Sequence, residues 1–294
     1  MFSPVATKDP AAVEAATQAA YLAMFPQGDR QYIPRIFSWA RACFTGQYAD
    51  YQPIDARYHD FEHTLQGALC MARLLYRRHV VGAAPALPQR LVELGLLAIL
   101  LHDTGYLKSR GDAEGTGAKY TITHVNRSAD FAARLLQEKG FAATEILAVQ
   151  NMIRCTGLDT ALTAIPFQSK TEEIVGHILG TSDLLGQMAA DDYVQKLPIL
   201  YSEFAEAAHY TNQKNAAVAL YSSVNELLTK TPGFWDNYVK PKLDRDFSGQ
   251  FHYFNDPYPD GPNWYFDKVE ANIRRLRERL AISPDTSFTR RQLV

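Results

Sequence analysis

The chain has 294 residues, of which 47% are hydrophobic and 21% are charged, and its formal net charge at pH 7 is -2. This near balance, with no dense cluster of Lys and Arg, excludes a protein that tracks a nucleic-acid backbone. We therefore expect a small-molecule partner, and a phosphate on that partner would have to be held by a metal or by a few basic side chains.

Cysteine usage and hydropathy indicate the cellular compartment in which the protein is expected. Cys43, Cys70 and Cys155 are scattered and form no CxxC pair, which is typical of a reduced cytoplasmic protein. The N-terminus lacks a basic segment followed by an apolar one, so we expect no signal peptide. The longest apolar stretch, 94–101, is too short to span a bilayer. We expect a cytoplasmic protein with no membrane partner, which could form a homo-oligomer.

Helical periodicity runs through most of the chain. The first predicted helix, 11–25, is amphipathic and is ended by Pro26 and Gly28. Alternating β-branched runs, which predict strands, are nearly absent. The fold class that we expect is therefore all-α. The further predicted helices span 32–44, 58–79, 89–101, 124–139, 143–155, 172–189, 191–208, 215–229, 234–240 and 266–280.

Two stretches interrupt the helical pattern. Residues 105–117 contain four glycines and several charges, which predicts a loop. Residues 247–265 are rich in proline, glycine and aromatic residues, which predicts an ordered loop or a lid. The aromatic side chains there could stack a base, but packing on the core is the favoured interpretation. The expected organisation is a helical extension (1–29), one helical domain (30–245), and a loop with a final helix packed on that domain (246–294).

Histidines and aspartates occur in segments that otherwise look buried. His59 and His63 are four residues apart in a predicted helix, so they would project from one face. The pair His102-Asp103 closes the apolar stretch LVELGLLAILL, where titratable groups are costly unless they are paired or bound to metal. Asp183 lies within HILGTSDLLGQM, another apolar run.

Inward-facing imidazoles and carboxylates in a helical bundle are typical of metal sites. We predict one or two divalent ions, of Mg, Mn, Zn or Fe. Asp103 could bridge to the second ion, with His124 as a ligand there. Such an ion activates a bound water and polarises a phosphoryl oxygen, and His59 would then be free to protonate the leaving oxygen. The expected ligands of the first ion are His63, His102, Asp103 and Asp183.

The order of these residues resembles the HD-domain superfamily of metal-dependent phosphohydrolases. The segment YHDFEHT is similar to the YHNxxHA element of class I cyclic nucleotide phosphodiesterases. Ser182-Asp183-Leu184 and Tyr201-Ser202-Glu203-Phe204 are similar to the metal-binding aspartate and the EF helix of that family. The resemblance implies an HD-type bundle that hydrolyses cyclic nucleotides with a metal-activated hydroxide. It also implies that His59 is the proton donor and His63 a metal ligand.

Several positions depart from that family. Its HD motif continues as HDxxH, and here Tyr106 takes the place of the last histidine. Gln213 is the candidate for its purine-binding glutamine. His124 looks like the third histidine of HD-GYP and other two-metal HD proteins, but their further histidine would fall near Cys155. Three alternatives therefore stay open: a nucleotidase for nucleoside monophosphates, a mixed-valent di-iron oxygenase, and a non-catalytic nucleotide-binding module.

Basic residues between and beyond the predicted ligands are candidates for binding the substrate phosphate. The glycine-rich loop between Asp103 and His124 has no GxxxxGK[ST] pattern, so it either carries basic side chains to the site or is a surface connection. Arg110 is the first candidate for the phosphate ligand, since its planar guanidinium group can bind two phosphate oxygens at once. The full set of candidates is Lys108, Arg110, Lys119 and Arg127.

Overall fold

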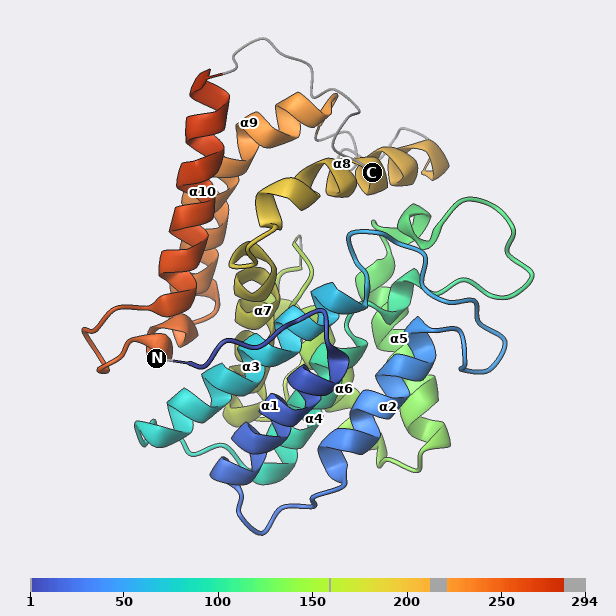
Figure 1. The fold of residues 1–294 in the computed structure, drawn as a ribbon. Coiled ribbons are helices and arrows are strands. Elements are labelled where there is room, and N and C mark those ends of the chain that lie inside the picture. Colours follow the sequence, from blue (N-terminus) through green and yellow to red (C-terminus); the bar gives the residue numbers. More distant parts are fainter. Residues whose placement is uncertain (1, 159, 212–220, 283–294) are drawn as a thin grey trace.

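The computed structural model describes residues 2–158, 160–211 and 221–282. These residues form an all-α fold (Figure 1), which confirms the predicted class. Within the described ranges, extended pairing is limited to isolated bridges between Tyr51 and Ser109 and between Asn255 and Asn263. None of the described helices has both the length and the apolar character that crossing a membrane requires.

Most of the predicted helices are confirmed to within a few residues. Their ends follow the local sequence: Pro10 begins the first helix, and the side chain of Asp9 caps it by accepting a hydrogen bond from the backbone N–H of Ala11. The helices are α1 (Pro10–Met24), α2 (Tyr32–Phe44), α3 (Phe61–Val80), α4 (Gln89–Leu101), α5 (His124–Glu138), α6 (Ala143–Arg154), α7 (Lys170–Met188), α8 (Tyr193–Tyr210), α9 (Val224–Phe234) and α10 (Trp264–Ile282).

Helix α3 begins later than the predicted helix 58–79. It begins at Phe61, because the carboxylate of Asp60 caps it by accepting a hydrogen bond from the N–H of His63 at 2.9 Å. His59 therefore precedes the helix. The expectation that His59 and His63 share one helix face is wrong, and their approach must come from the path of the chain before the cap.

The bundle is built around α3, which packs against α1, α4 and α7. Glycines allow α3 and α7 to approach closely: a Cβ atom on Gly186 would lie 2.8 Å from the backbone of Gln66. A Cβ atom on Gly67 would lie 3.9 Å from the Cα atom of Asp183. This contact brings the first turns of α3 next to the middle of α7, where His63 and Asp183 lie.

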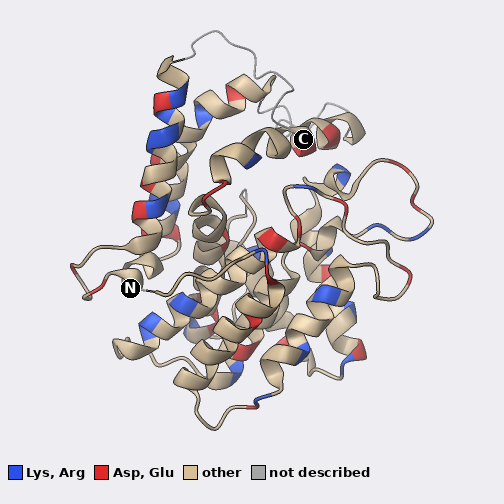
Figure 2. Ribbon diagram, in the orientation of Figure 1, with Lys and Arg blue, Asp and Glu red and all other residues tan. Residues whose placement is uncertain are grey.

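The C-terminal helices group on one side of this bundle. Figure 1 shows α8, α9 and α10 together, beyond α7. The predicted helix 234–240 continues α9 as a π-helical segment, Trp235–Val239, and a second one follows at Lys242–Asp246. The predicted helix 215–229 begins outside the described residues, and its remainder corresponds to α9. Figure 2 shows acidic and basic residues interspersed along the helices.

The two predicted loops contain short helical turns. Thr104–Tyr106 and Gly117–Tyr120 form 3-10 helices at the ends of the loop between α4 and α5. The aromatic stretch 247–265 contains a 3-10 helix, Gln250–Phe254, that packs against α3 and α7. The side chains of Phe251 and Phe254 are buried in the core, as the packing interpretation predicted.

Candidate metal centre

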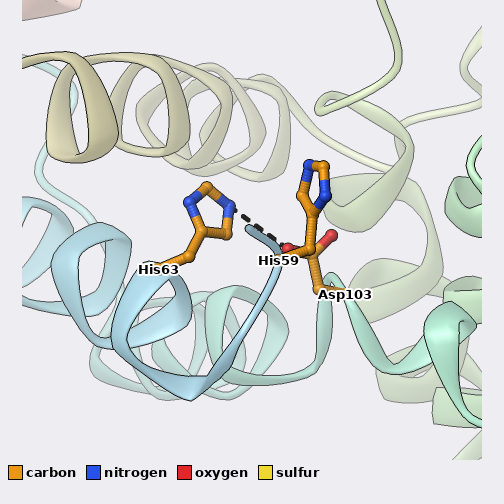
Figure 3. Close-up of side chains that lie close together, drawn as sticks. All are labelled: His59, His63 and Asp103. Atoms are coloured by element: carbon orange, nitrogen blue, oxygen red, sulfur yellow. Dashed lines mark ion pairs between the residues drawn. The ribbon is translucent and has the colours of Figure 1, made fainter. Parts of the chain in front are cut away.

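Four buried side chains from α3, α7 and the C-terminal end of α4 face one another inside the bundle. The Nε2 atom of His63 lies 3.2 Å from Oδ2 of Asp103 and 3.3 Å from Oδ1 of Asp183. The Nε2 atom of His102 lies 3.2 Å and 3.4 Å from the same two oxygens. Each residue is at most 9% exposed. In Figure 3, His63 points toward the carboxylate of Asp103, and His59 lies beside them.

These distances fit donors that surround a metal ion. Two donors that are each about 2.1 Å from an ion are roughly 3.0 Å apart at a right angle and about 3.4 Å apart at a tetrahedral angle. Nε2 of His102 and Oδ2 of Asp103 are buried and make no hydrogen bond with any described residue. Buried polar atoms without partners are costly, and a divalent ion would satisfy both. This group of histidines and aspartates could therefore hold a metal ion.

The electrostatics of the group favour ionised carboxylates. Burial raises the pKa of Asp103 and of Asp183, but the charge of His102 outweighs burial and holds both below their usual range. Burial lowers the pKa of His63, yet interactions with the two aspartates raise it to about 9. Metal binding would displace that proton, since an imidazole must be neutral to ligate.

Backbone carbonyls determine which ring nitrogen can bind metal. Nδ1 of His102 lies 2.7 Å from the carbonyl oxygen of Ile99, and Nδ1 of His124 lies 2.5 Å from that of Thr121. Because a carbonyl oxygen only accepts hydrogen bonds, Nδ1 carries the hydrogen in both rings. When the ring is neutral, as metal binding requires, Nε2 carries the lone pair, as in metal sites whose ligands are oriented by outer partners.

His124 lies on the other side of Asp103. Its Nε2 atom is 3.8 Å from Oδ1 of Asp103, the oxygen that does not face His63 and His102. Asp103 thus presents one oxygen to each side. A second ion bridged by Asp103, with His124 as its ligand, stays a prediction. Cys155 is buried at the end of α6 and packs near Gly176.

His59 is held by a buried glutamate of α8. Nδ1 of His59 lies 2.5 Å from Oε2 of Glu203, and Oε1 of Glu203 accepts a hydrogen bond from the N–H of Tyr58 at 2.7 Å. A ring nitrogen of His59 is within 4.8 Å of donor atoms of His63 and Asp103. Sequence reasoning placed Glu203 only within the resemblance. The available signal was a carboxylate one helical turn from the apolar residues Ile199, Leu200 and Ala207.

A second residue that sequence reasoning did not place in the site is Tyr106. Its ring centroid is 4.6 Å from that of His59 and 4.8 Å from that of His124, with interplanar angles of 18° and 21°. The ring is fully buried. Tyr106 therefore stacks on both histidines.

Two of the four candidate phosphate ligands are engaged in ion pairs and hydrogen bonds with neighbouring residues. Nζ of Lys108 lies 3.1 Å from Oδ2 of Asp55 and also donates to the carbonyl oxygen of Gly115. Lys119 pairs with Asp112 at 2.5 Å. Thr116 donates from its N–H and its hydroxyl to Glu206 of α8. The loop is thus tied to α8 and to itself.

The two arginines differ in their surroundings. Arg127 donates to the carbonyl oxygens of Gly105 and Leu107 at 2.7 and 2.8 Å, and it stacks over Tyr120. It also lines a cavity of about 290 Å³ to which none of the clustered histidines and aspartates contributes. Arg110 is exposed, and no described residue forms an ion pair or side-chain hydrogen bond with it. Gln213, the candidate purine ligand, lies outside the described residues.

A comparison with known protein families places the chain. A family model described as Npun_R2479-like matches residues 11–249, a span that contains every residue of the candidate centre. No curated protein matches the chain.

Proposed function

The chain belongs to the Npun_R2479-like family, and we propose that it is a metal-dependent phosphohydrolase that cleaves a phosphoester bond. One observation carries the proposal: two buried imidazole nitrogens each lie 3.2–3.4 Å from the same two carboxylate oxygens. Two of these donor atoms have no hydrogen-bond partner among the described residues. Hard carboxylates with imidazoles suit Mg, Mn, Fe or Zn.

His63, His102, Asp103 and Asp183 would hold the first ion, with Asp103 and His124 available to a second. Bound there, an ion would lower the pKa of a water molecule and polarise a phosphoryl oxygen. The buried helices α4 and α7 keep bulk water from the carboxylates, which strengthens their attraction for a cation.

His59 has the position of a proton donor. In hydrolysis, the water oxygen forms a bond to phosphorus while the ester P–O bond breaks, and the leaving alkoxide takes a proton. His59 would give that proton from the ring nitrogen that Glu203 does not hold, and a proton released by the water would restore it. General acid catalysis of this kind contributes roughly 10²- to 10⁴-fold to the rate.

Cyclic nucleotides are the first candidate substrates. The two segments that resemble the cyclic nucleotide phosphodiesterases, around His59 and around Glu203, are joined by the hydrogen bond between these residues. Alkoxide leaving groups, such as those of a cyclic phosphodiester, benefit most from a held proton donor. Arg110, exposed on the loop after Asp103, remains the candidate for the substrate phosphate.

The test compares the native protein with His102→Ala and Asp183→Ala variants, and His209→Ala serves as a control at an exposed histidine. Metal content is measured after dialysis. Activity is measured on cyclic AMP, cyclic GMP and nucleoside 5'-monophosphates with Mg, Mn, Zn or Fe added. We expect both site variants, and not the control, to lose metal and cyclic nucleotide hydrolysis. Unchanged metal content in both site variants would contradict the proposal, and hydrolysis of monophosphates alone would favour a nucleotidase.

A further inference from the structure

One aromatic ring contacts two histidines at the rim of the candidate centre. Tyr106 lies on the turn that follows Asp103, and its ring is nearly parallel to the rings of His59 and His124. The centroids of the two imidazoles are 6.0 Å apart and their planes are inclined at 37°. Stacked rings are about 3.5 Å apart, so rings on opposite faces of Tyr106 would be about 7 Å or more from each other. Both imidazoles therefore lie side by side on the same face of Tyr106, and we call these three rings the His–Tyr–His stack.

Tyr106 is itself held rigidly. Its backbone N–H donates to the carbonyl oxygen of Asp103 at 3.1 Å. Gly117 packs directly on it, since a Cβ atom there would lie 2.2 Å from the carbonyl oxygen of Tyr106. The side chain is fully buried, so solvent does not compete for either face of the ring. A ring fixed in this way can impose its plane on its neighbours.

The two histidines differ in the other constraints on their ring planes, because His59 also meets the rings of Tyr58 and His63 edge-on, at centroid distances of 5.1 and 5.3 Å. His59 is held at Nδ1 by Glu203, and His124 is held at Nδ1 by the carbonyl oxygen of Thr121. A single hydrogen bond fixes one atom of an imidazole but leaves the ring free to tilt about it. Near-parallel stacking against Tyr106 is the restraint that both rings share.

We infer that Tyr106 is a positioning residue that sets the ring planes of His59 and His124, and so the direction of their free nitrogens. That this direction serves proton donation by His59 rests on the proposed function. The positioning of the two rings by Tyr106 does not depend on that function. An aromatic ring is what the position requires, and its hydroxyl group is not needed for this role.

The first experiment records NMR signals of the histidine ring protons, assigned with His59→Gln and His124→Gln variants. An adjacent aromatic ring shifts these signals upfield. Tyr106→Phe should keep the shifted positions, whereas Tyr106→Leu should move both sets downfield. Tyr32→Leu is the matched control, because Tyr32 is also buried and contacts no histidine ring. It should destabilise the protein and leave these signals in place. Unmoved signals in Tyr106→Leu would overturn the inference.

The second experiment measures kcat and KM on an alkyl phosphodiester and on its nitrophenyl counterpart, which needs little protonation. Tyr106→Leu should lower kcat on the alkyl ester by on the order of 10-fold, less than removal of the acid itself, with a smaller loss on the nitrophenyl ester and little change in KM. Tyr106→Phe should restore the native ratio. Equal losses on both esters would overturn the positioning role. If the native protein hydrolyses neither ester, the proposed function fails, while the NMR result still decides the stack.

Discussion

Glu203 of α8 accepts a hydrogen bond from Nδ1 of His59 at 2.5 Å, although the two residues are 144 positions apart in the chain. The same carboxylate accepts from the backbone N–H of Tyr58. Burial raises the pKa of Glu203, but the charge and the hydrogen bond of His59 lower it below its usual range. Glu203 therefore stays ionised and ties the segment before α3 to α8.

Replacing Glu203 should release His59 without removing metal. In Glu203→Ala, the buried N–H of Tyr58 loses its partner, which costs about 1–3 kcal/mol in the free energy of unfolding. We expect turnover on alkyl phosphoesters to fall while metal content stays native. The control is Glu206→Ala, which removes a neighbouring α8 carboxylate that binds Thr116. A fall of the same size in the control would show that the effect is a general one of α8.

Removing His59 itself should separate proton donation from metal binding. His59→Ala is expected to keep its metal and to lose roughly 10²- to 10⁴-fold in turnover on alkyl esters, the usual effect of a general acid. The loss should be much smaller with a nitrophenolate leaving group. Metal analysis and kinetics on both ester types check this. If the variant lost its metal, His59 would be a ligand, as its closeness to His63 and Asp103 permits.

Alanine substitutions of the basic loop residues Arg110 and Lys119 should have different effects, one on catalysis and the other on stability. Charge-assisted hydrogen bonds to phosphate contribute about 1.5–3 kcal/mol, so Arg110→Ala should lower kcat/KM by roughly 10- to 100-fold. Lys119→Ala should instead loosen the loop, because Lys119 pairs with Asp112 and donates to the carbonyl oxygen of Glu114. Its main effect should be a lower Tm. Full activity in Arg110→Ala would show that a residue other than Arg110 binds the substrate phosphate.

The contact between α3 and α7 offers a test far from any ligand atom. A Cβ atom on Gly186 would overlap the backbone of Gln66. Overpacking of this kind lowers the free energy of unfolding by about 1–3 kcal/mol. The higher helix propensity of alanine offsets at most about 1 kcal/mol of that loss. Gly186→Ala should therefore lower the free energy of unfolding and weaken metal binding, since α7 carries Asp183.

Gly111→Ala is the matched control for that variant. Gly111 is exposed in the loop, and a Cβ atom there would meet nothing within 4 Å. Its effect should stay within about 0.5 kcal/mol in the free energy of unfolding, as for most surface substitutions. Equal stability and equal metal affinity in Gly186→Ala and Gly111→Ala would show that the helix contact does not position Asp183.

Sequence periodicity predicted the parts of the site that depend on helices alone. His102, Asp103 and Asp183 stood out because they are titratable groups in apolar helices, and the structure brings them together. The cap at Asp60 was missed, because a helical pattern does not distinguish a capping carboxylate from a first-turn residue. Glu203 and Tyr106 act through contacts between α8, the α4–α5 loop and the segment before α3. No local spacing encodes such contacts.

The central claim is that the converging donors of α3, α7 and the end of α4 hold a metal ion. Anomalous diffraction from crystals of the protein grown with Mn or Zn tests it most directly, because it locates the ion. We predict a peak at bonding distance, about 2.0–2.3 Å, from Nε2 of His63, Nε2 of His102 and one oxygen each of Asp103 and Asp183. A centre with no peak, or an ion bound only elsewhere, would contradict the account.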